Sequence, residues 1–481
     1  MGLFILFFFA MTEIALTVLT FTKWPEKASF RRNRLIATAA EFILPVLIMV
    51  LPTTYLKWRF AVAVGLVGIR LVIAGIRFFG GKAQGNVKKA SRILCCVLVL
   101  VLSAMSLLPS FLFANYNGLP LSGEYDFAQC SAILVDRSRI DTFETDGSYR
   151  EVPVHFFYPD AEGTFPLVIF SHGAFGYYES NFSTYAELAS QGYVVAALDH
   201  PHHAFFTKDT SGSMVIVDTT FFANAMEFGN SDMSTAEGAF ATTRQWMQLR
   251  TGDMNFVVDT IKAACETGKL SDAFFAEEKD TVLSVIEKTD TLSSAFFTEE
   301  KDAVLSVIRK TDTSKIGLLG HSMGGATAVA VGRQRDDITA VIVLDGSMLS
   351  EITDAKTGSV SYENTPYPIP VLDFRKAEDY NMVEAVLHGE QSREKYGYIF
   401  DFCYVNNHVI DNAVDGRTVV FDNAGHMDFT DLPMFSPFLG GLLGSGDVDN
   451  EAFMATVNSL VLNWFDYYLK GEGTLDIQAR Y

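Results

Sequence analysis

Long apolar runs separated by short polar connections fill the first 115 residues of the chain. Each of four runs is close to the ~20 residues that a helix needs to cross a bilayer. They are Gly2–Thr22, Leu35–Leu56, Phe60–Phe79 and Ile93–Ala114. Residues 1–115 are therefore predicted to form a transmembrane helical region of four spans.

Charged side chains interrupt three of these runs, at Glu13, Glu41 and Arg70. A charge at this depth is costly in lipid and usually faces protein or water. Our hypothesis is that the three side chains pair inside the bundle. The bundle itself serves either as a plain anchor or in lipid access or partner binding.

Basic residues gather in the first and third connections between the runs. They are Lys23, Lys27, Arg31, Arg32 and Arg34 in the first, and Arg77, Lys82, Lys88, Lys89 and Arg92 in the third. The positive-inside rule places both connections in the cytoplasm, so the chain after residue 115 is expected outside it, at a cell membrane. A cleaved signal peptide is the alternative for the first run, but no basic segment precedes that run and further runs follow.

A different pattern starts at residue 151, where short apolar runs alternate with helical segments. Strands are predicted at 152–159, 165–170, 193–198, 316–319, 340–344, 368–372 and 418–421, and helices at 182–191, 246–265 and 457–469. This alternation is typical of a mostly parallel sheet with helices on both faces, so residues 151–481 are predicted to form one α/β domain. Residues 116–150 are expected to be a linker and leading segment.

Two further segments of this domain stand out. Residues 205–245, rich in Thr, Ser, Phe and Met, are expected to cover a site or to face the membrane. In the helix that follows, Arg250, Asp253 and Asp259 are expected on the polar side. Leu270–Thr291 recurs as Leu292–Thr313 with 18 identities in 22 positions, a tandem duplication at 270–313 to which we assign no function. One copy leads into the strand at 316–319.

Charge divides the chain at the same boundary as hydropathy. Residues 1–115 hold 13 Lys and Arg against 3 Asp and Glu, whereas the remainder holds 24 against 54. The acidic remainder argues against nucleic acid or anionic lipid headgroups as electrostatic partners. The five cysteines allow the region after residue 115 one disulfide at most, and no C-x-x-C motif is present.

The stretch Ile316–Ala326 carries the clearest chemistry. An apolar strand runs into Gly320-His321-Ser322-Met323-Gly324, and small residues typical of a closely packed helix follow. A G-x-S-x-G motif between strand and helix is typical of the nucleophile elbow of α/β-hydrolases. Ser322 is therefore the candidate nucleophile, with a simple glycine-rich turn as the alternative.

Backbone N–H groups near the elbow are candidates for binding a developing oxyanion. In this fold one donor is the residue after the nucleophile, here Met323. The other follows a His-Gly pair at the end of an earlier strand, here His172-Gly173, which nominates Ala174.

A serine hydroxyl needs a base, and the base needs an acid that orients it. Chain order Ser, acid, His is the order of α/β-hydrolases. His408 and His426 lie late enough in the chain, and His426 directly follows the last predicted strand, in a loop. Asp345 and Asp373 each follow a predicted strand, and the residues alone leave the choice between them open.

Three clustered histidines, His200, His202 and His203, raise the question of a metal. They would need a further ligand from elsewhere, so they are more simply a polar strand end that lines or caps the cleft. We predict neither a metal nor a cofactor.

Several segments resemble the platelet-activating-factor acetylhydrolase family. They are Phe170–Gly173, Gly192–Asp199, Asp312–Gly317, Gly320–Ala326, Leu344–Gly346 and His426–Phe429. The resemblance implies the α/β-hydrolase fold, Asp345 as the acid, and a calcium-independent serine esterase that acts on short or oxidised acyl chains of phospholipids. The four spans and the duplication are not part of the family pattern.

The expected function is thus a membrane-anchored serine hydrolase of carboxylic esters, with a lipid or other small ester as substrate and an integral membrane region. The alternatives are a polyester or cutin-type esterase, an acyltransferase of the cell envelope, and a membrane scaffold or sensor with a relic hydrolase domain. The sequence leaves the oligomeric state open.

Overall fold

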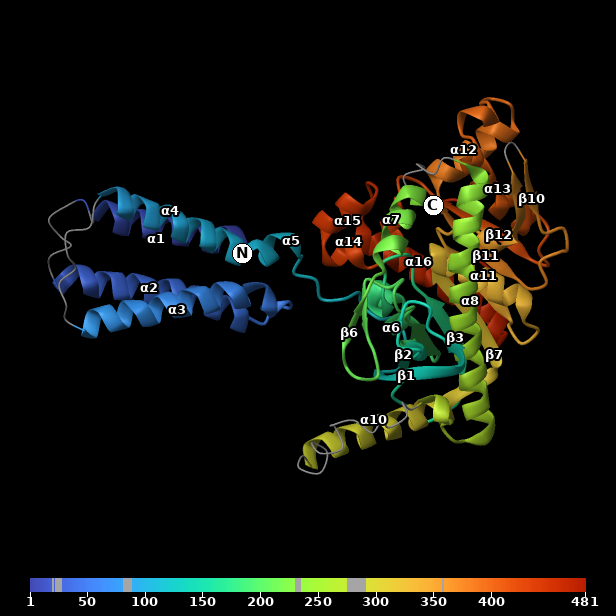
Figure 1. Cartoon of the computed structure of the whole chain (residues 1–481), viewed down its shortest axis with the longest axis horizontal. Coiled ribbons are helices and arrows are strands. Elements are labelled where there is room, and N and C mark those ends of the chain that lie inside the picture. Colours follow the sequence, from blue (N-terminus) through green and yellow to red (C-terminus); the bar gives the residue numbers. More distant parts are fainter. Residues whose placement is uncertain (20, 22–27, 81–88, 230–234, 275–290, 357–358) are drawn as a thin grey trace. The chain divides into compact units, whose positions relative to one another are not determined.

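The computed structural model describes residues 1–19, 21, 28–80, 89–229, 235–274, 291–356 and 359–481 (Figure 1). These residues form two compact units. The first comprises residues 1–118 and 432–443, and the second comprises residues 119–431 and 444–481. Lys23, Lys27, Lys82 and Lys88, which contribute to the predicted orientation, lie outside the described residues.

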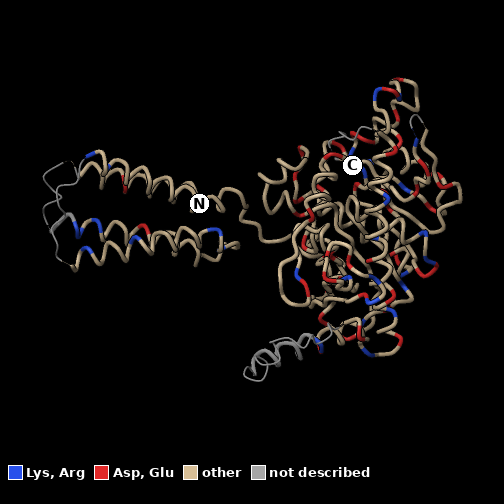
Figure 2. Tube along the Cα trace, viewed as in Figure 1, with Lys and Arg blue, Asp and Glu red and all other residues tan. Residues whose placement is uncertain are grey.

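Four helices of the first unit are long and apolar enough to cross a membrane. They are α1 Gly2–Leu19, α2 Ala28–Val50, α3 Ala61–Phe79 and α4 Lys89–Ser106. Figure 2 shows long stretches without charge along them. The fourth predicted run is divided, because α4 ends at Ser106 and a short helix, α5 Leu108–Leu112, follows with Pro109 in its first turn. Proline lacks a backbone N–H and its ring crowds the carbonyl four residues earlier, so it is tolerated in the first turn of a helix but not in the interior.

The three charges within the spans meet, which confirms the pairing hypothesis. Arg70 Nη2 lies 3.0 Å from Glu41 Oε2 and also forms an ion pair with Glu13 Oε1. Both carboxylates are buried within the unit. One guanidinium on α3 therefore joins α1 and α2 through charge.

The first unit also contains α14 Leu432–Phe435 and α15 Pro437–Leu443, far along the chain from the spans. The N–H of Ala114 donates to Phe435 O at 2.9 Å, and Ser436 Oγ donates to Leu112 O at 2.5 Å. The rings of Phe113 and Phe435 lie 5.0 Å apart. The sequence analysis assigned this apolar segment to the α/β domain and did not predict its place beside α5.

The second unit is built on an eight-stranded sheet with the order β1-β2-β4-β3-β7-β8-β11-β12. The strands are β1 Phe127–Ile140, β2 Tyr149–Pro159, β3 Phe165–Ser171, β4 Val194–Leu198, β7 Thr311–His321, β8 Ala340–Leu344, β11 Val371–Lys376 and β12 Gly416–Phe421. β1 and β2 pair antiparallel, and the strands from β4 to β12 in this order are parallel. The predicted α/β-hydrolase fold is confirmed.

Helices cover both faces of this sheet. Gly317 of β7 lies against Phe465 and Leu469, so this face is covered by α16 Asn450–Phe465 and the π-turn Asp466–Lys470 that continues it. The next residue, Leu318, points to the opposite face and packs in the core with α8 Ala236–Thr267 and α11 Met323–Gln334. Alternate residues of a strand face opposite sides, which is why one strand packs against both layers.

Three predictions need correction. Residues 127–140, placed in a linker and leading segment, form β1, an edge strand whose apolar run is short, Ala132–Val135, and is flanked by polar and charged positions. The helix predicted at 246–265 begins at Ala236, where Thr235 Oγ1 caps it by accepting from Gly238 N. Arg250 and Asp253, expected on the polar side, are buried.

Between β4 and α8 the chain forms a hairpin, β5 Phe206–Lys208 and β6 Met214–Ile216, and then α7 Thr219–Gly229. The second copy of the duplication forms most of α10 Thr291–Lys310, which leads into β7. Most of the first copy, residues 275–290, lies outside the described residues. The five cysteines are free thiols.

Replacing Arg70 by Leu should destabilise the first unit, because two carboxylates then remain buried without their cation. The expected loss is about 3–5 kcal/mol, the usual cost of removing one partner of a buried pair. The loss of stability is measured on the purified full chain in detergent, by following its size-exclusion profile as the temperature is raised. The triple variant Glu13→Gln, Glu41→Gln, Arg70→Leu should recover most of the loss; a single variant as stable as the wild type would contradict the pairing.

Candidate active site

Ser322 lies at the turn between β7 and α11, with φ 54° and ψ −124°. A positive φ is costly for a residue with a side chain, and such strain is a recurring feature of functional turns. Flanking glycines make room for the turn. A Cβ on Gly320 would lie 2.2 Å from the carbonyl carbon of Gly324, and one on Gly324 would lie 1.9 Å from Ser171 O. The half-buried serine hydroxyl is thereby placed at the carboxyl end of the sheet.

The structure brings Ser322, His426 and Asp345 together. His426 Nε2 lies 3.0 Å from Ser322 Oγ, and His426 Nδ1 lies 2.6 Å from Asp345 Oδ2. His426 belongs to the turn that follows β12, and Asp345 follows β8 directly. Three segments far apart in the sequence thus supply a connected chain of hydroxyl, imidazole and carboxyl groups.

Asp345 is held as a carboxylate. Burial alone would raise its pKa, but the hydrogen bond from His426 and the charges of His426 and Lys376 outweigh burial and bring the pKa to about 2. The N–H of Lys376 donates to the second oxygen, Asp345 Oδ1, at 2.9 Å. A carboxylate bonded to imidazole Nδ1–H leaves Nε2 free to accept the serine proton.

Asp373 lies elsewhere. The sequence analysis placed it at the end of a strand, but β11 runs on to Lys376, so Asp373 is inside the strand and fully buried. Asn406 Nδ2 lies 3.0 and 3.1 Å from its two oxygens and also donates to Gly346 O. Burial raises the pKa of Asp373 to about 7. Its contacts are with Asn406 and Arg375, whereas Asp345 is the carboxylate on His426.

The loop after β3 approaches the serine closely. A Cβ on Gly173 would lie 3.1 Å from Ser322 Cβ and 2.8 Å from His321 Nδ1. Among the described residues, neither Ala174 N–H nor Met323 N–H has a hydrogen-bond partner. These two nominated donors are therefore unengaged beside the candidate nucleophile.

Comparison with known proteins gives the family. The model described as "Platelet-activating factor acetylhydrolase, isoform II" matches residues 151–474, two thirds of the chain. The chain belongs to this family. All the site residues above lie within the matched region, whereas the four apolar helices precede it.

A curated relative, a platelet-activating factor acetylhydrolase of Cavia porcellus, is 24% identical over 314 residues. The alignment covers 63% of this chain, and the chain spans 58% of the relative's length. Among solved structures, a ferulic acid esterase from Streptomyces cinnamoneus has 19% identity and a TM-score of 0.49, over 75% of this chain and 95% of that one.

Two side chains that the sequence analysis did not nominate hold the loop that carries His426 in place. His321, the residue before Ser322, has Nε2 at 3.1 Å from His426 O, and burial lowers its pKa to about 3, so it donates as a neutral imidazole. Asp428 Oδ2 accepts from Gly425 N and Gly446 N, both at 2.7 Å. Both residues stand inside quoted motifs, but only the folded chain shows what they bind.

Four other histidines that the sequence analysis considered, His200, His202, His203 and His408, each have partners of their own. His200 and His203 are buried among polar groups, and His202 is half-buried near Glu144. His408, the other late histidine, lies in α13 Tyr398–Asp411 with Nε2 2.8 Å from Glu363 O. Within the described part of the chain, no group of three or more His, Cys, Asp or Glu side chains is arranged to hold a metal ion.

Asp373 should make stability depend on pH. Its folded pKa of about 7 exceeds the unfolded value of ~3.9, so its stabilising contribution is complete below about pH 4 and is lost as the pH rises through 7. Asp373→Asn removes this dependence. The difference in unfolding free energy, variant minus wild type, should therefore rise between pH 4 and pH 8, by at most about 4 kcal/mol. Chemical denaturation at several pH values measures it.

Asp336→Asn, which changes an exposed carboxyl, is the matched control and should leave the pH profile as it is. A variant-minus-wild-type difference for Asp373→Asn that stays constant from pH 4 to pH 8 would contradict the assignment of a buried, protonated carboxyl.

Proposed function

We propose that the chain is a membrane-anchored serine hydrolase that cleaves carboxylic esters through an acyl-enzyme. The observation that carries the proposal is the contact chain Ser322 Oγ, His426, Asp345 at 3.0 and 2.6 Å, placed on a strained turn. Membership of the platelet-activating factor acetylhydrolase family supports the same chemistry.

In the first half-reaction, Ser322 Oγ attacks the ester carbonyl carbon while His426 Nε2 takes the hydroxyl proton. Asp345 keeps Nδ1 protonated and stabilises the imidazolium that forms. Collapse of the tetrahedral intermediate breaks the bond between the carbonyl carbon and the leaving oxygen, and His426 delivers its proton to that oxygen. An alcohol leaves, and the acyl group stays on Ser322.

In the second half-reaction, water attacks the acyl carbon and His426 takes a proton from it. The bond to Ser322 Oγ breaks, the serine regains its proton from His426, and a carboxylic acid leaves. In both halves the negative charge on the carbonyl oxygen would be bound by the N–H groups of Ala174 and Met323. Preorganised donors of this kind each contribute about 10²–10³ in rate.

A lipid ester is the proposed substrate class, because exposed apolar side chains adjoin the oxyanion loop. We call these side chains the apolar rim; they are Phe205, Phe206, Met214, Ile216, Phe222 and Met226. Phe175, next to Ala174, packs its ring 4.9 Å from that of Phe222, and Phe205 N donates to Gly176 O at 3.1 Å. Contiguous exposed apolar surface is typical of contact with a lipid phase or a hydrophobic ligand.

Membrane anchoring is part of the proposal and rests on the four apolar helices. With the basic first and third connections inside, the hydrolase unit faces away from the cytoplasm. The acidic charge of the chain beyond residue 115 disfavours anionic headgroups, so we propose neutral or zwitterionic lipid esters with short or oxidised acyl chains.

Removing the proposed nucleophile or base should abolish ester turnover without unfolding the chain. Ser322→Ala and His426→Ala should reduce kcat for a soluble short-chain ester to background, and Asp345→Asn should reduce it about 10³–10⁴-fold, because the imidazole then adopts the wrong tautomer. Asp373→Asn is the matched control and should keep kcat within a few-fold. Turnover retained by Ser322→Ala would refute the assignment; acyl product on an added alcohol instead of free acid would indicate acyl transfer.

If the apolar rim contacts lipid, substitutions in it should lower hydrolysis of a membrane-embedded substrate but not of a water-soluble one. The variant Phe205→Ser, Met214→Ser, Ile216→Ser should lower hydrolysis of a short-acyl phosphatidylcholine in zwitterionic vesicles at least about tenfold, since each lost apolar contact weakens interfacial binding. Hydrolysis of a water-soluble acetate ester should be unchanged. Leu387→Ser with Val414→Ser, at exposed apolar positions on other elements, is the control. Equal loss on both substrates would contradict a lipid-facing rim.

A further inference from the structure

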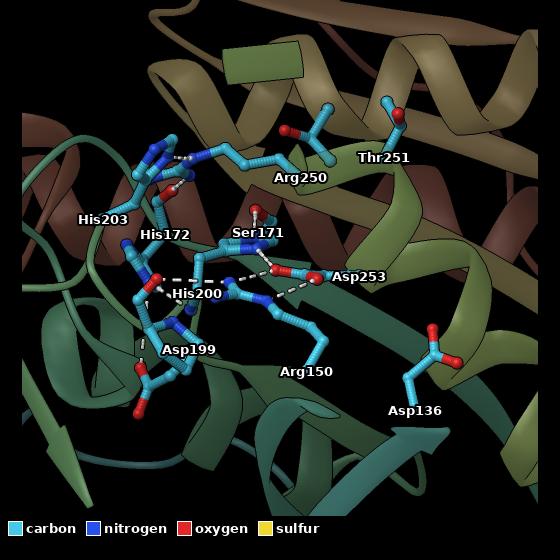
Figure 3. A network of polar contacts seen from close by, with 12 residues as sticks. Asp136, Arg150, Ser171, His172, Asp199, His200, His203, Arg250, Thr251 and Asp253 are labelled. Carbon is cyan, nitrogen blue, oxygen red and sulfur yellow. Dashed lines mark hydrogen bonds and ion pairs between the residues drawn. The ribbon is translucent and has the colours of Figure 1, made fainter. Parts of the chain in front are cut away.

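A buried polar network (Figure 3) contacts the backbone of His172 and Gly173, the two residues before Ala174. Its central member, Arg250 on α8, is fully buried. Nη1 donates to His172 O at 2.5 Å, Nη2 donates to Gly173 O at 3.2 Å, and Nε donates to His203 Nδ1 at 3.3 Å. No carboxylate forms an ion pair with Arg250 in the described part of the chain. The guanidinium is thus directed at two consecutive backbone carbonyls.

The second carbonyl belongs to the peptide group that contains the Ala174 N–H. A peptide group is planar, so fixing the oxygen of Gly173 also fixes the direction of the N–H at its other end. A positive donor on the oxygen also polarises the group, which strengthens the N–H as a donor. The proposed oxyanion donor is therefore held and strengthened from the rear by Arg250.

Two further donors reach the same oxygen, the N–H of Gly176 at 3.2 Å and the ring of His172. His200 N donates to His172 Nε2 at 3.2 Å, so the ring proton of neutral His172 is on Nδ1. That Nδ1 lies 2.6 Å from Gly173 O and donates to it. Burial and the nearby Arg250 charge lower the pKa of His172 well below its usual range, which keeps this neutral tautomer.

Asp253, one helical turn after Arg250, fixes the rest of the network. It accepts from Arg150 Nη2 at 2.8 Å and from His200 Nδ1 at 3.0 Å. Burial would raise the pKa of Asp253, but the Arg150 charge and the hydrogen bonds from His200 and Arg150 hold it well below its usual range. His200 Nε2 then accepts from Ser171 Oγ at 2.9 Å, which ties the end of β3 to the same carboxylate.

Stability alone does not explain why the charge of Arg250 is buried in this way. A buried guanidinium is expensive, and an apolar side chain of similar volume would often serve the fold as well or better. We propose that Arg250 is a positioning residue that sets the oxyanion-binding peptide of Gly173 and Ala174, with Asp253 as its support. The inference rests on the proposed ester hydrolysis and adds a residue outside the Ser322, His426 and Asp345 chain.

The test compares Arg250→Met, Arg250→Lys and the control Arg333→Met in the full-length protein. Arg333, in the last turn of α11, is half-buried and bonds the buried carboxylate of Glu351, whereas Ser322 precedes the first turn, so it reports a general cost of losing an arginine from an ion pair. With a soluble ester, Arg250→Met should lower kcat about 10²-fold or more at nearly constant KM, because only charge that develops in the transition state is affected. Arg333→Met should leave kcat unchanged.

An alkyl trifluoromethyl ketone, which forms a tetrahedral adduct with an active serine, gives the second readout. For Arg250→Met its affinity should fall by the same factor as kcat/KM, while the affinity for the parent ester changes little. Arg250→Lys keeps the charge and can reach one carbonyl, so its kcat and its affinity for the ketone should lie between those of the wild type and Arg250→Met. If Arg250→Met does not fold, Arg250→Lys is the variant that tests the inference.

Unchanged kcat in a folded Arg250 variant, or lost kcat with unchanged inhibitor affinity, would overturn the inference. A wild-type protein that neither turns over esters nor binds the ketone would refute the proposed function itself, and the inference with it. The two failures are distinct, because the first appears only in the variants.

Discussion

The backbone at Ser322 has φ 54°, a conformation that costs a residue with a side chain on the order of 1–3 kcal/mol, and close contacts with neighbouring segments hold it there. Its N–H donates to Leu344 O at 2.8 Å, which joins the turn to the neighbouring strand. A side chain on Gly346 would lie 2.2 Å from Ser322 O, and one on Gly173 would meet the serine itself. The ends of β3, β7 and β8, together with the loops that follow β3 and β8, therefore converge on Ser322.

Both units pair some buried charges and direct others at backbone carbonyls. In the helical unit, Arg70 joins Glu13 and Glu41 between apolar helices, whereas the buried Arg59 donates to Leu56 O and Phe113 O. In the hydrolase unit, Asp253 is balanced by Arg150, whereas Arg250 is left for two carbonyl oxygens. Buried charge that is paired can be explained by assembly. Buried charge directed at the backbone of a loop beside a candidate nucleophile is better explained by the loop's function.

Much of the second unit is predictable from the sequence because its strands, helices and elbow turn are set by residues close together in the chain. The apolar strands and the G-x-S-x-G turn nominate Ser322 as the candidate nucleophile, and position after the last strand nominates His426 as the candidate base. The choice of Asp345 over Asp373 needed family resemblance, because both follow apolar runs and only the folded chain shows that β11 continues past Asp373. Arg250 could not be identified in advance, since its partner His172 O lies 78 residues away and a helix position alone suggested an exposed side.

The edge strand β1 and the segment Leu432–Leu443 escaped prediction for a similar reason. β1 owes its place to backbone pairing with β2, and its side chains are too polar to reveal it. Leu432–Leu443 is apolar, but nothing local indicates that it packs beside α5 near the spans. In both cases the deciding contacts are distant in sequence.

The central claim is that Ser322 is an activated nucleophile, and covalent labelling tests it most directly. Full-length protein is treated with a fluorophosphonate, digested and mapped by mass spectrometry, beside Ser322→Ala and His426→Ala. The account predicts one adduct, on Ser322, in the wild type and none in either variant. Folded wild-type protein that stays unlabelled, or an adduct on another serine, would contradict it.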